Sequence, residues 1–276
     1  MNGLAAVVSL AMVAGGVSAA PGEPEGRTSD VVHEAMAVVG QQTAKENIEV
    51  VGQAGSTVRA ETEDGTFAVT AEPGVDAAVV QHEDGLQVMA VLEDGATQTT
   101  YDLTVPEGVE LVPSGDAFEF VVEEGGSRLS LGEIEAPWAV DAEGRLVETS
   151  YELDGQRLVQ HIEGDVTYPV VADPRLTFGV GVYLNMWGWE MNAVSTAIVA
   201  AGGAAAVATC ALNKVPAGLA SLTKLLCTAV GAPTLAAIYR EILKVWRDGS
   251  DVQACYQARI VGPRTAFTKV GAQNCG

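Results

Sequence analysis

Histidine is the residue type best suited to act as a general base near neutral pH, and the chain contains three. His33 falls in a short helical pattern near the N-terminus, whereas His82 and His161 fall within predicted strands. None of them lies in a pattern typical of hydrolases, metalloproteases or nucleotide-binding loops. A histidine on a strand surface is more often structural than catalytic, so we predict no catalytic residue and no enzyme activity.

Carboxylates are the other abundant reactive groups, because the chain holds 36 Asp and Glu against 15 Lys and Arg. So many acids bring some pairs together in any fold, and paired carboxylates therefore do not indicate glycosidase chemistry. Calcium is the metal that such a surface favours, but no Asp-x-Asp-x-Asp-Gly loop occurs. We expect no metal site and no cofactor, and we interpret the acids as an aid to solubility.

The four cysteines, Cys210, Cys227, Cys255 and Cys275, all lie in the last third of the chain. Zinc binding is one interpretation, but the spacing contains no Cys-x2-Cys pair and does not match structural zinc sites. An even number of cysteines outside such motifs favours disulfides, and disulfides indicate an oxidising compartment.

Four cysteines allow three pairings. A helical turn centred near Ala217 would bring Cys210 and Cys227 to similar heights, with an axial mismatch of about 4.5 Å. A hairpin in the last segment would leave Cys255 close enough to Cys275 for the short tail to join them. We therefore predict the pairs Cys210–Cys227 and Cys255–Cys275.

Charge is distributed very unevenly along the chain. Residues 174–276 carry nine Lys and Arg against four Asp and Glu, a net charge of +5, and the preceding 173 residues carry −26. This asymmetry predicts two modules, divided near Pro174, that attract one another or have different partners. A strongly acidic module repels phosphates, so we expect no nucleic-acid partner.

The N-terminus has the pattern of a secretion signal. An apolar run from Leu4 to Val17 is followed by small residues, and we expect residues 1–20 to be a signal peptide cleaved after Ala19 or Ala20. No Lys or Arg precedes the run, so either the true start lies upstream or the signal is weak; a buried core helix is the alternative interpretation. We expect a secreted protein, extracellular or associated with the cell envelope.

Residues 21–55 are expected to form a linker and a short helix, and residues 56–174 an acidic β-rich domain. The latter consists of short runs rich in Val, Thr, Tyr and Phe, separated by glycine-containing turns. Asp64-Gly65, Asp84-Gly85, Asp94-Gly95 and Asp154-Gly155 are typical of hairpin turns. We predict roughly ten strands in an all-β sandwich or meander.

Residues 175–276 are expected to form an Ala/Gly-rich helical domain. The 23 residues from Met191 to Asn213 are uncharged and long enough to cross a bilayer, but they are too rich in Ala and Gly to favour a membrane span. Gly202-Gly203 should interrupt the helix in this stretch. Further helices are predicted after Pro216 and Pro233, followed by a hairpin. The expected fold class is α+β: an N-terminal all-β domain, then a small disulfide-stapled helical domain with a C-terminal β-hairpin.

An aromatic group precedes the uncharged stretch: Phe178, Tyr183, Trp187 and Trp189. These side chains would either pack the junction between the two modules or lie at a membrane interface. We favour the junction, because aromatic rings supply large buried areas to small cores.

The segment Tyr168–Pro174 reads Y-P-V-V-A-D-P and resembles an element that recurs in secreted actinobacterial proteins of unknown function. In that group the motif ends a β domain. An aromatic segment, an Ala-rich helical region with cysteines on either side of a proline, and a cysteine-flanked hairpin follow it. Residues 140–276 match this order. The resemblance implies secretion and this architecture, and it carries no activity.

Two functions are consistent with these patterns. The first is a secreted or cell-envelope-associated, non-catalytic interaction protein, in which residues 175–276 contact the acidic module and a protein partner or an anionic membrane surface. The alternative is a membrane-active, bacteriocin-like protein, in which the acidic module masks a cationic helical module that perturbs anionic bilayers.

Overall fold

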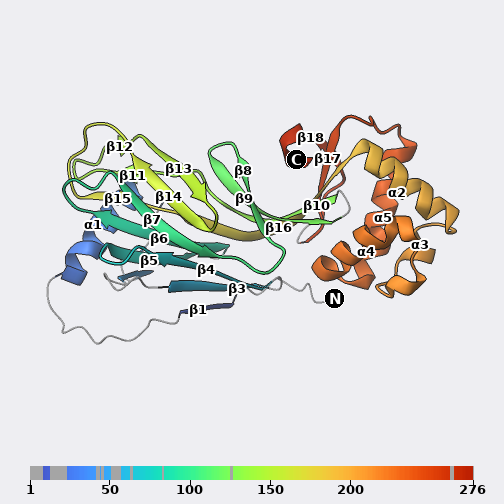
Figure 1. Ribbon diagram of the computed structural model, residues 1–276, viewed down its shortest axis with the longest axis horizontal. Coiled ribbons are helices and arrows are strands. Elements are labelled where there is room, and N and C mark those ends of the chain that lie inside the picture. The colour runs from blue at the N-terminus through green and yellow to red at the C-terminus, as the bar shows by residue number, and fades with distance from the viewer. Residues whose placement is uncertain are drawn as a thin grey trace.

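The computed structural model describes residues 9–12, 24–41, 44, 47–50, 57–62, 65–82, 84–124, 127–261 and 264–275. Strands dominate the first two thirds, and helices gather at the far end, with the last strands beside them (Figure 1). The predicted α+β class is therefore confirmed. Of the predicted signal peptide, residues 1–8 and 13–20 lie outside the described part.

The smaller sheet has six antiparallel strands in the order β1-β3-β4-β7-β14-β13. Their bounds are β1 Ser9–Met12, β3 Thr57–Thr62, β4 Gly65–Ala71, β7 Gln98–Thr104, β13 Thr149–Asp154 and β14 Arg157–Ile162. Strand β1 falls within the predicted signal peptide and pairs with β3, so it forms one edge of this sheet.

The larger sheet has twelve strands, and its main path runs β12-β11-β15-β6-β16-β10-β9-β8. Strands β5 and β2 are attached through β6, and β17 and β18 through β16. The bounds are β2 Ile48–Val50, β5 Asp76–His82, β6 Gly85–Leu92, β8 Glu110–Ser114, β9 Ala117–Glu124, β10 Ser127–Ile134, β11 Ala139–Val140, β12 Leu146–Val147, β15 Val170–Ala172, β16 Arg175–Trp187, β17 Cys255–Arg259 and β18 Thr268–Val270.

Strand β6 is buried along its whole length because both of its faces are covered. Leu86 and Val88 point into the core between the two sheets, whereas Met89 and Val91 belong to a second apolar cluster on the outer face. Helix α1 (Pro24–Val38) covers that outer face. The alternation of side chains across a strand thus sends successive residues into two different cores.

The hairpin predictions have mixed outcomes. Asp154-Gly155 joins β13 to β14, and the strands on either side of the first two predicted turns, β3–β4 and β5–β6, pair as hairpins. Asp94-Gly95 instead connects β6 in the larger sheet to β7 in the smaller one, so the hairpin prediction there is wrong. The same turn residues serve a crossover between sheets, because they tolerate positive φ wherever the chain reverses.

Strand β16 extends the large sheet well past the predicted module boundary. Its first residues pair with β6, residues 176–178 and 183–185 pair with β10, and residues 183–187 pair with β17. Residues 175–187 were expected in the helical domain and are strand instead. The change of charge near Pro174 and the change of structure after Trp187 are therefore separate, and one apolar core runs through both parts.

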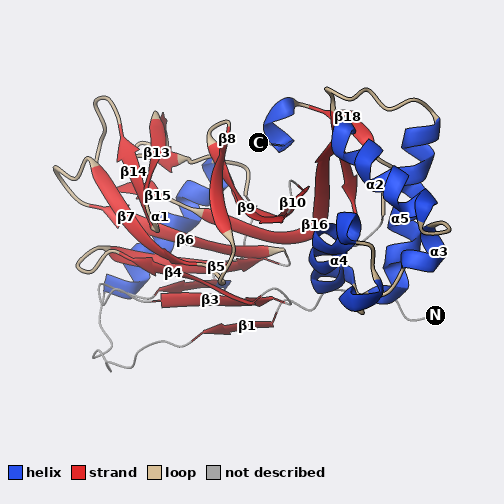
Figure 2. Ribbon diagram, turned by 45° about the vertical axis from the view of Figure 1, so that its right-hand side comes forward, coloured by secondary structure: helices blue, strands red, loops and turns tan. Residues whose placement is uncertain are grey.

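The far end contains α2 (Gly188–Ala200), α3 (Ala204–Val207), α4 (Ala217–Val230) and α5 (Ala232–Arg247), shown in blue in Figure 2. Gly202 and Gly203, with φ of 96° and 103°, end α2 as the sequence predicts. Across the described residues, the helices are too short or too polar to cross a membrane.

Two disulfides hold this end together, and they are the predicted pairs. Cys210–Cys227 ties the segment before α4 to that helix, and Cys255–Cys275 ties β17 to the C-terminal turn. Their Cα atoms are 5.8 and 5.9 Å apart, within the usual range for disulfides. Both bridges indicate an oxidising environment. The predicted hairpin is present as β17 and β18.

Candidate binding groove beside helix α5

The structure separates the four aromatic residues that the sequence grouped together. Phe178 lies in the core, with its ring centroid 4.6 Å from that of Phe67. Tyr183 and Trp187 are half-buried on β16, which places them where the sheet meets the helices. Trp189, at the start of α2, is 56% exposed. Phe178 therefore cannot contact a membrane in this fold, whereas Trp189 is free to do so.

The three histidines lie on different elements and form no shared site. His33 is on α1, His161 lies 3.2 Å from the Glu152 carboxylate on the surface of the small sheet, and His82 contacts the Gln87 side chain at 3.1 Å. Burial lowers the pKa of His82. None of these contacts places a hydroxyl or thiol nucleophile beside an imidazole.

The Y-P-V-V-A-D-P segment supplies the most deeply buried carboxylate of this region, Asp173, which is 1% exposed. Its Oδ2 accepts a hydrogen bond of 2.7 Å from Gln87 Nε2, and its Oδ1 accepts one of 3.2 Å from the backbone N–H of Trp138. Burial raises the pKa of Asp173 to about 7, against the opposing effect of these hydrogen bonds.

Two tyrosines from the small sheet reach the same segment. Tyr101 Oη donates to the carbonyl oxygen of Ala172 at 3.1 Å, and Tyr151 Oη donates to the carbonyl oxygen of Asp173. The segment therefore joins β7 and β13 of one sheet to β6 and β15 of the other. This arrangement fastens the two sheets together and presents no group to a ligand.

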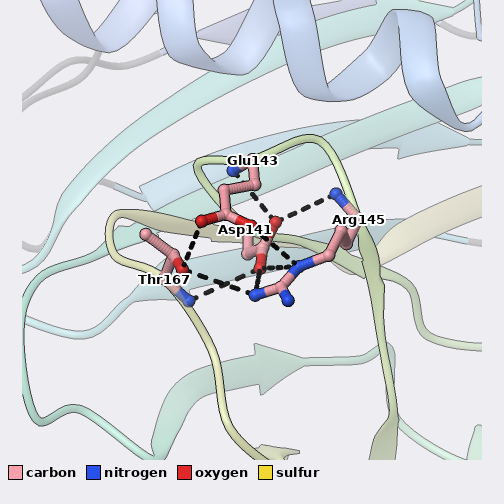
Figure 3. Close-up of polar contacts among 4 residues, drawn as sticks. All are labelled: Asp141, Glu143, Arg145 and Thr167. Carbon is pink, nitrogen blue, oxygen red and sulfur yellow. Dashed lines mark hydrogen bonds and ion pairs between the residues drawn. The ribbon is translucent and has the colours of Figure 1, made fainter.

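A second polar cluster, shown in Figure 3, surrounds Asp141 between β11 and β12. Arg145 donates to its carboxylate from Nε and Nη2 at 2.9 and 2.6 Å, and the backbone N–H groups of Glu143 and Arg145 donate to Oδ1. Burial alone would raise the pKa of Asp141, but these hydrogen bonds hold it below its usual value. The carboxylate is fully occupied, so we interpret the cluster as a turn-stabilising contact.

Metal binding finds no support in the described parts of the chain, where no three His, Cys, Asp or Glu side chains gather as ligands. The site that remains is a groove of about 320 Å³ between α5 and the β17–β18 hairpin. Buried apolar side chains line it from both elements: Ile238, Ala258, Ile260 and Phe267. Pockets of about this size and lining are typical of small-molecule sites.

The groove carries a basic rim over this apolar lining. Arg240 and Lys244 stand on successive turns of α5, Arg259 is on β17 and Arg264 is in the hairpin loop, with Glu241 as the one carboxylate among the lining residues. Within the described residues, no ion pair uses Arg240, Lys244 or Arg264. Arg240, Lys244 and Arg264 therefore present positive charge to a partner at the rim.

The hairpin loop is held against β17 by two hydrogen bonds. The backbone N–H of Thr265 donates to the carbonyl oxygen of Arg259 at 3.2 Å, and the backbone N–H of Arg259 donates to Thr265 Oγ1 at 2.9 Å. These bonds hold Thr265, the neighbour of Arg264, against β17. The Cys255–Cys275 bridge anchors the other end of β17, so the groove is preorganised.

Comparison of the chain with models of protein families, with curated proteins and with solved structures gave no match. Part of this site has a signal in the sequence, where Arg240, Glu241, Lys244 and Arg247 recur at the spacing typical of the polar face of a helix. The sequence did not indicate the groove, which requires the hairpin to pack beside that helix.

Proposed function

We propose that this chain is a secreted or cell-envelope-associated, non-catalytic protein that binds an anionic partner through the groove beside α5. The basic rim over an apolar lining is the observation that carries the proposal, because it matches a ligand with both negative charge and apolar surface. The two disulfides and the resemblance of the Tyr168–Pro174 segment to secreted proteins support the proposed location.

The acidic part supports the groove as a scaffold. Lys224 on α4 forms an ion pair of 2.8 Å with Glu124 on β9, and Arg128 on β10 donates to the carbonyl oxygen of Gln273 at 3.3 Å. The Lys224–Glu124 pair is of the kind that the charge asymmetry predicts between the cationic and acidic parts. Both contacts leave Arg240, Lys244 and Arg264 available for a partner.

Fractionation of producing cells into cytoplasm, membrane, wall and medium tests this proposal. We expect the protein outside the cytoplasm with both disulfides formed, and we expect its envelope-bound fraction to elute with salt, since exposed charge pairs are screened. The R240E/K244E variant should lose the envelope-bound fraction, and R247E should keep it, because Arg247 lies on the same helix outside the groove. A reduced protein confined to the cytoplasm would contradict the proposal.

A second function, membrane activity of the helical end, is favoured by the exposed face of α2, which the acidic part leaves uncovered. Trp189, Ala193, Thr196 and Val199 are exposed there, and none of them is charged. Such a face, with tryptophan at one end, suits a bilayer interface. The test is release of dye from anionic and neutral vesicles by the full chain, with W189S as the comparison. Equal release from both vesicle types, or release unchanged by W189S, would count against it.

A further inference from the structure

We infer that the groove beside α5 binds a single-headed anionic amphiphile of the fatty-acid class, with its carboxylate at Arg240, Lys244 and Arg264 and its chain against the apolar lining. This inference rests on the proposed function and narrows it to one class of ligand.

The size of the groove limits the apolar part of the ligand. A cavity of about 150 Å³ in a protein core holds one benzene molecule. The groove has about 320 Å³, which corresponds to roughly a dozen carbon atoms by the same measure. Ile238, Ile260 and Phe267 line the groove with apolar surface, and its volume suits one alkyl chain of this length rather than two.

The basic side chains at the rim determine which polar headgroup the ligand can carry. Arg240 and Lys244 are one helical turn apart, close enough for one carboxylate to contact both. Arg264 lines the same groove from the hairpin, and a guanidinium binds carboxylates in bidentate geometry. Glu241 lies on the same rim and repels a second negative charge. The rim therefore suits one anionic head better than a polyanion.

The lining also argues against an acidic peptide. A peptide laid on this floor would bury backbone N–H and C=O groups, and the apolar side chains there offer them no hydrogen bonds. An alkyl chain carries no such cost. A second cavity, about 120 Å³ under α1, is lined by Glu34 and Asp141 and has the wrong charge for the same ligand.

Calorimetric titration of the oxidised full chain tests the inference with three probes, each at concentrations where it is monomeric and dissolved: dodecanoate, dodecanol and butanoate. Dodecanoate should bind at least about tenfold more tightly than either of the others, because dodecanol lacks the charge and butanoate lacks most of the chain. The R240Q/K244Q variant should lose most of that advantage over dodecanol. The R247Q variant, which removes a nearby charge outside the groove, should keep it.

A variant that fills the groove gives a second readout. Ala237 lines the groove and is half-buried, so A237W should abolish binding of dodecanoate and dodecanol alike while the far-UV circular dichroism stays unchanged. Equal affinities for dodecanoate and dodecanol, or an R240Q/K244Q variant that behaves like R247Q, would overturn the fatty-acid assignment. If no probe binds while envelope retention still depends on Arg240 and Lys244, the ligand class is wrong and the proposed function stands. If no probe binds and envelope retention is also independent of Arg240 and Lys244, both the fatty-acid assignment and the proposed function fail.

Discussion

At the scale of single residues, two buried acids have raised pKa values at opposite ends of the molecule. Burial raises the pKa of Asp173, in the seam between the sheets, to about 7. It does the same for Glu190 at the start of α2, although the Trp187 backbone N–H donates to that carboxylate at 2.6 Å. Each group therefore binds a proton more tightly in the folded state than in the unfolded state.

The Asp173→Asn variant should remove part of the pH dependence of stability. Because the folded pKa lies above the unfolded one, Asp173 favours folding at low pH, and this contribution is lost as pH rises from about 4 to about 7, by up to about 1.4 kcal/mol per pH unit. Urea unfolding at several pH values should show the wild-type free energy of unfolding falling relative to D173N over this range. The exposed Asp116→Asn serves as the control, and parallel profiles for D173N and wild type would refute the assignment.

Glu190→Gln should have an effect of the same sign, since its folded pKa is also raised to about 7. A glutamine oxygen can still accept the Trp187 N–H, so helix α2 should remain formed while the ionisable group is lost. Urea unfolding of E190Q and wild type at pH 5 and at pH 8 measures the difference in their free energies of unfolding at each pH. An unchanged difference between the two pH values would show that Glu190 ionises as readily when folded as when unfolded.

At the scale of elements, close backbone contacts decide where glycine is required. Helix α2 begins at Gly188, and a Cβ there would overlap the backbone carbonyl of Asp251. Gly218 lies in the first turn of α4, where a Cβ would make an ordinary contact of 3.8 Å with the Ala197 methyl. The Asp251 backbone therefore requires glycine at position 188, whereas nothing requires glycine at position 218.

The two glycines should respond to alanine in opposite directions. Gly188→Ala should destabilise the protein by about 1–3 kcal/mol, because the Asp251 backbone must move. Gly218→Ala should stabilise it by about 0.5–1 kcal/mol, because alanine loses less backbone entropy in a helix. Thermal or urea unfolding of both variants measures this, and equal effects would contradict the packing described here.

The elements also show how far the sequence alone could lead. The glycine break after α2, the helix opened by Pro233 and the C-terminal hairpin were predicted because each depends on local residue preferences. Strand β16 was missed although Leu176, Phe178, Val182, Leu184 and Met186 alternate as in a strand. The change of charge at Pro174 drew attention away from this alternation.

The binding groove lay beyond sequence reasoning for a different reason. Arg240 and Lys244 were visible as the polar face of a helix, which is an ordinary solvated surface. Only the packing of a hairpin beside that face adds Arg264 and the apolar floor. Likewise, Asp94-Gly95 has the residues of a hairpin turn, and tertiary contacts decided that the chain crosses to the other sheet there.

At the scale of the whole molecule, one apolar core extends from Val58 in the small sheet to Phe267 beside the groove. We therefore expect one cooperative unfolding transition while the disulfides are intact. Tryptophan fluorescence, which comes mainly from Trp187, Trp189 and Trp246 at the helical end, should coincide with far-UV circular dichroism in urea. Two separate transitions would show that the parts unfold independently.

Reduction of the disulfides should break this coincidence. Both bridges lie at the helical end, and each is expected to contribute about 2–4 kcal/mol. The fluorescence transition should then shift to lower urea, ahead of the loss of β structure. Coincident transitions after reduction would show that packing against the sheet, rather than the bridges, holds the helices.

Strand β16 also fixes the relative position of the two charged regions that a partner could contact. The acidic part and the groove are joined by the backbone hydrogen bonds of β16 with β10 and β17. A flexible tether in place of this strand would have let the two regions rotate relative to one another. When a partner contacts both regions, this protein therefore loses no inter-domain freedom. The partner always contacts the same arrangement of negative and positive charge. One long strand makes two oppositely charged surfaces into a single template of fixed geometry.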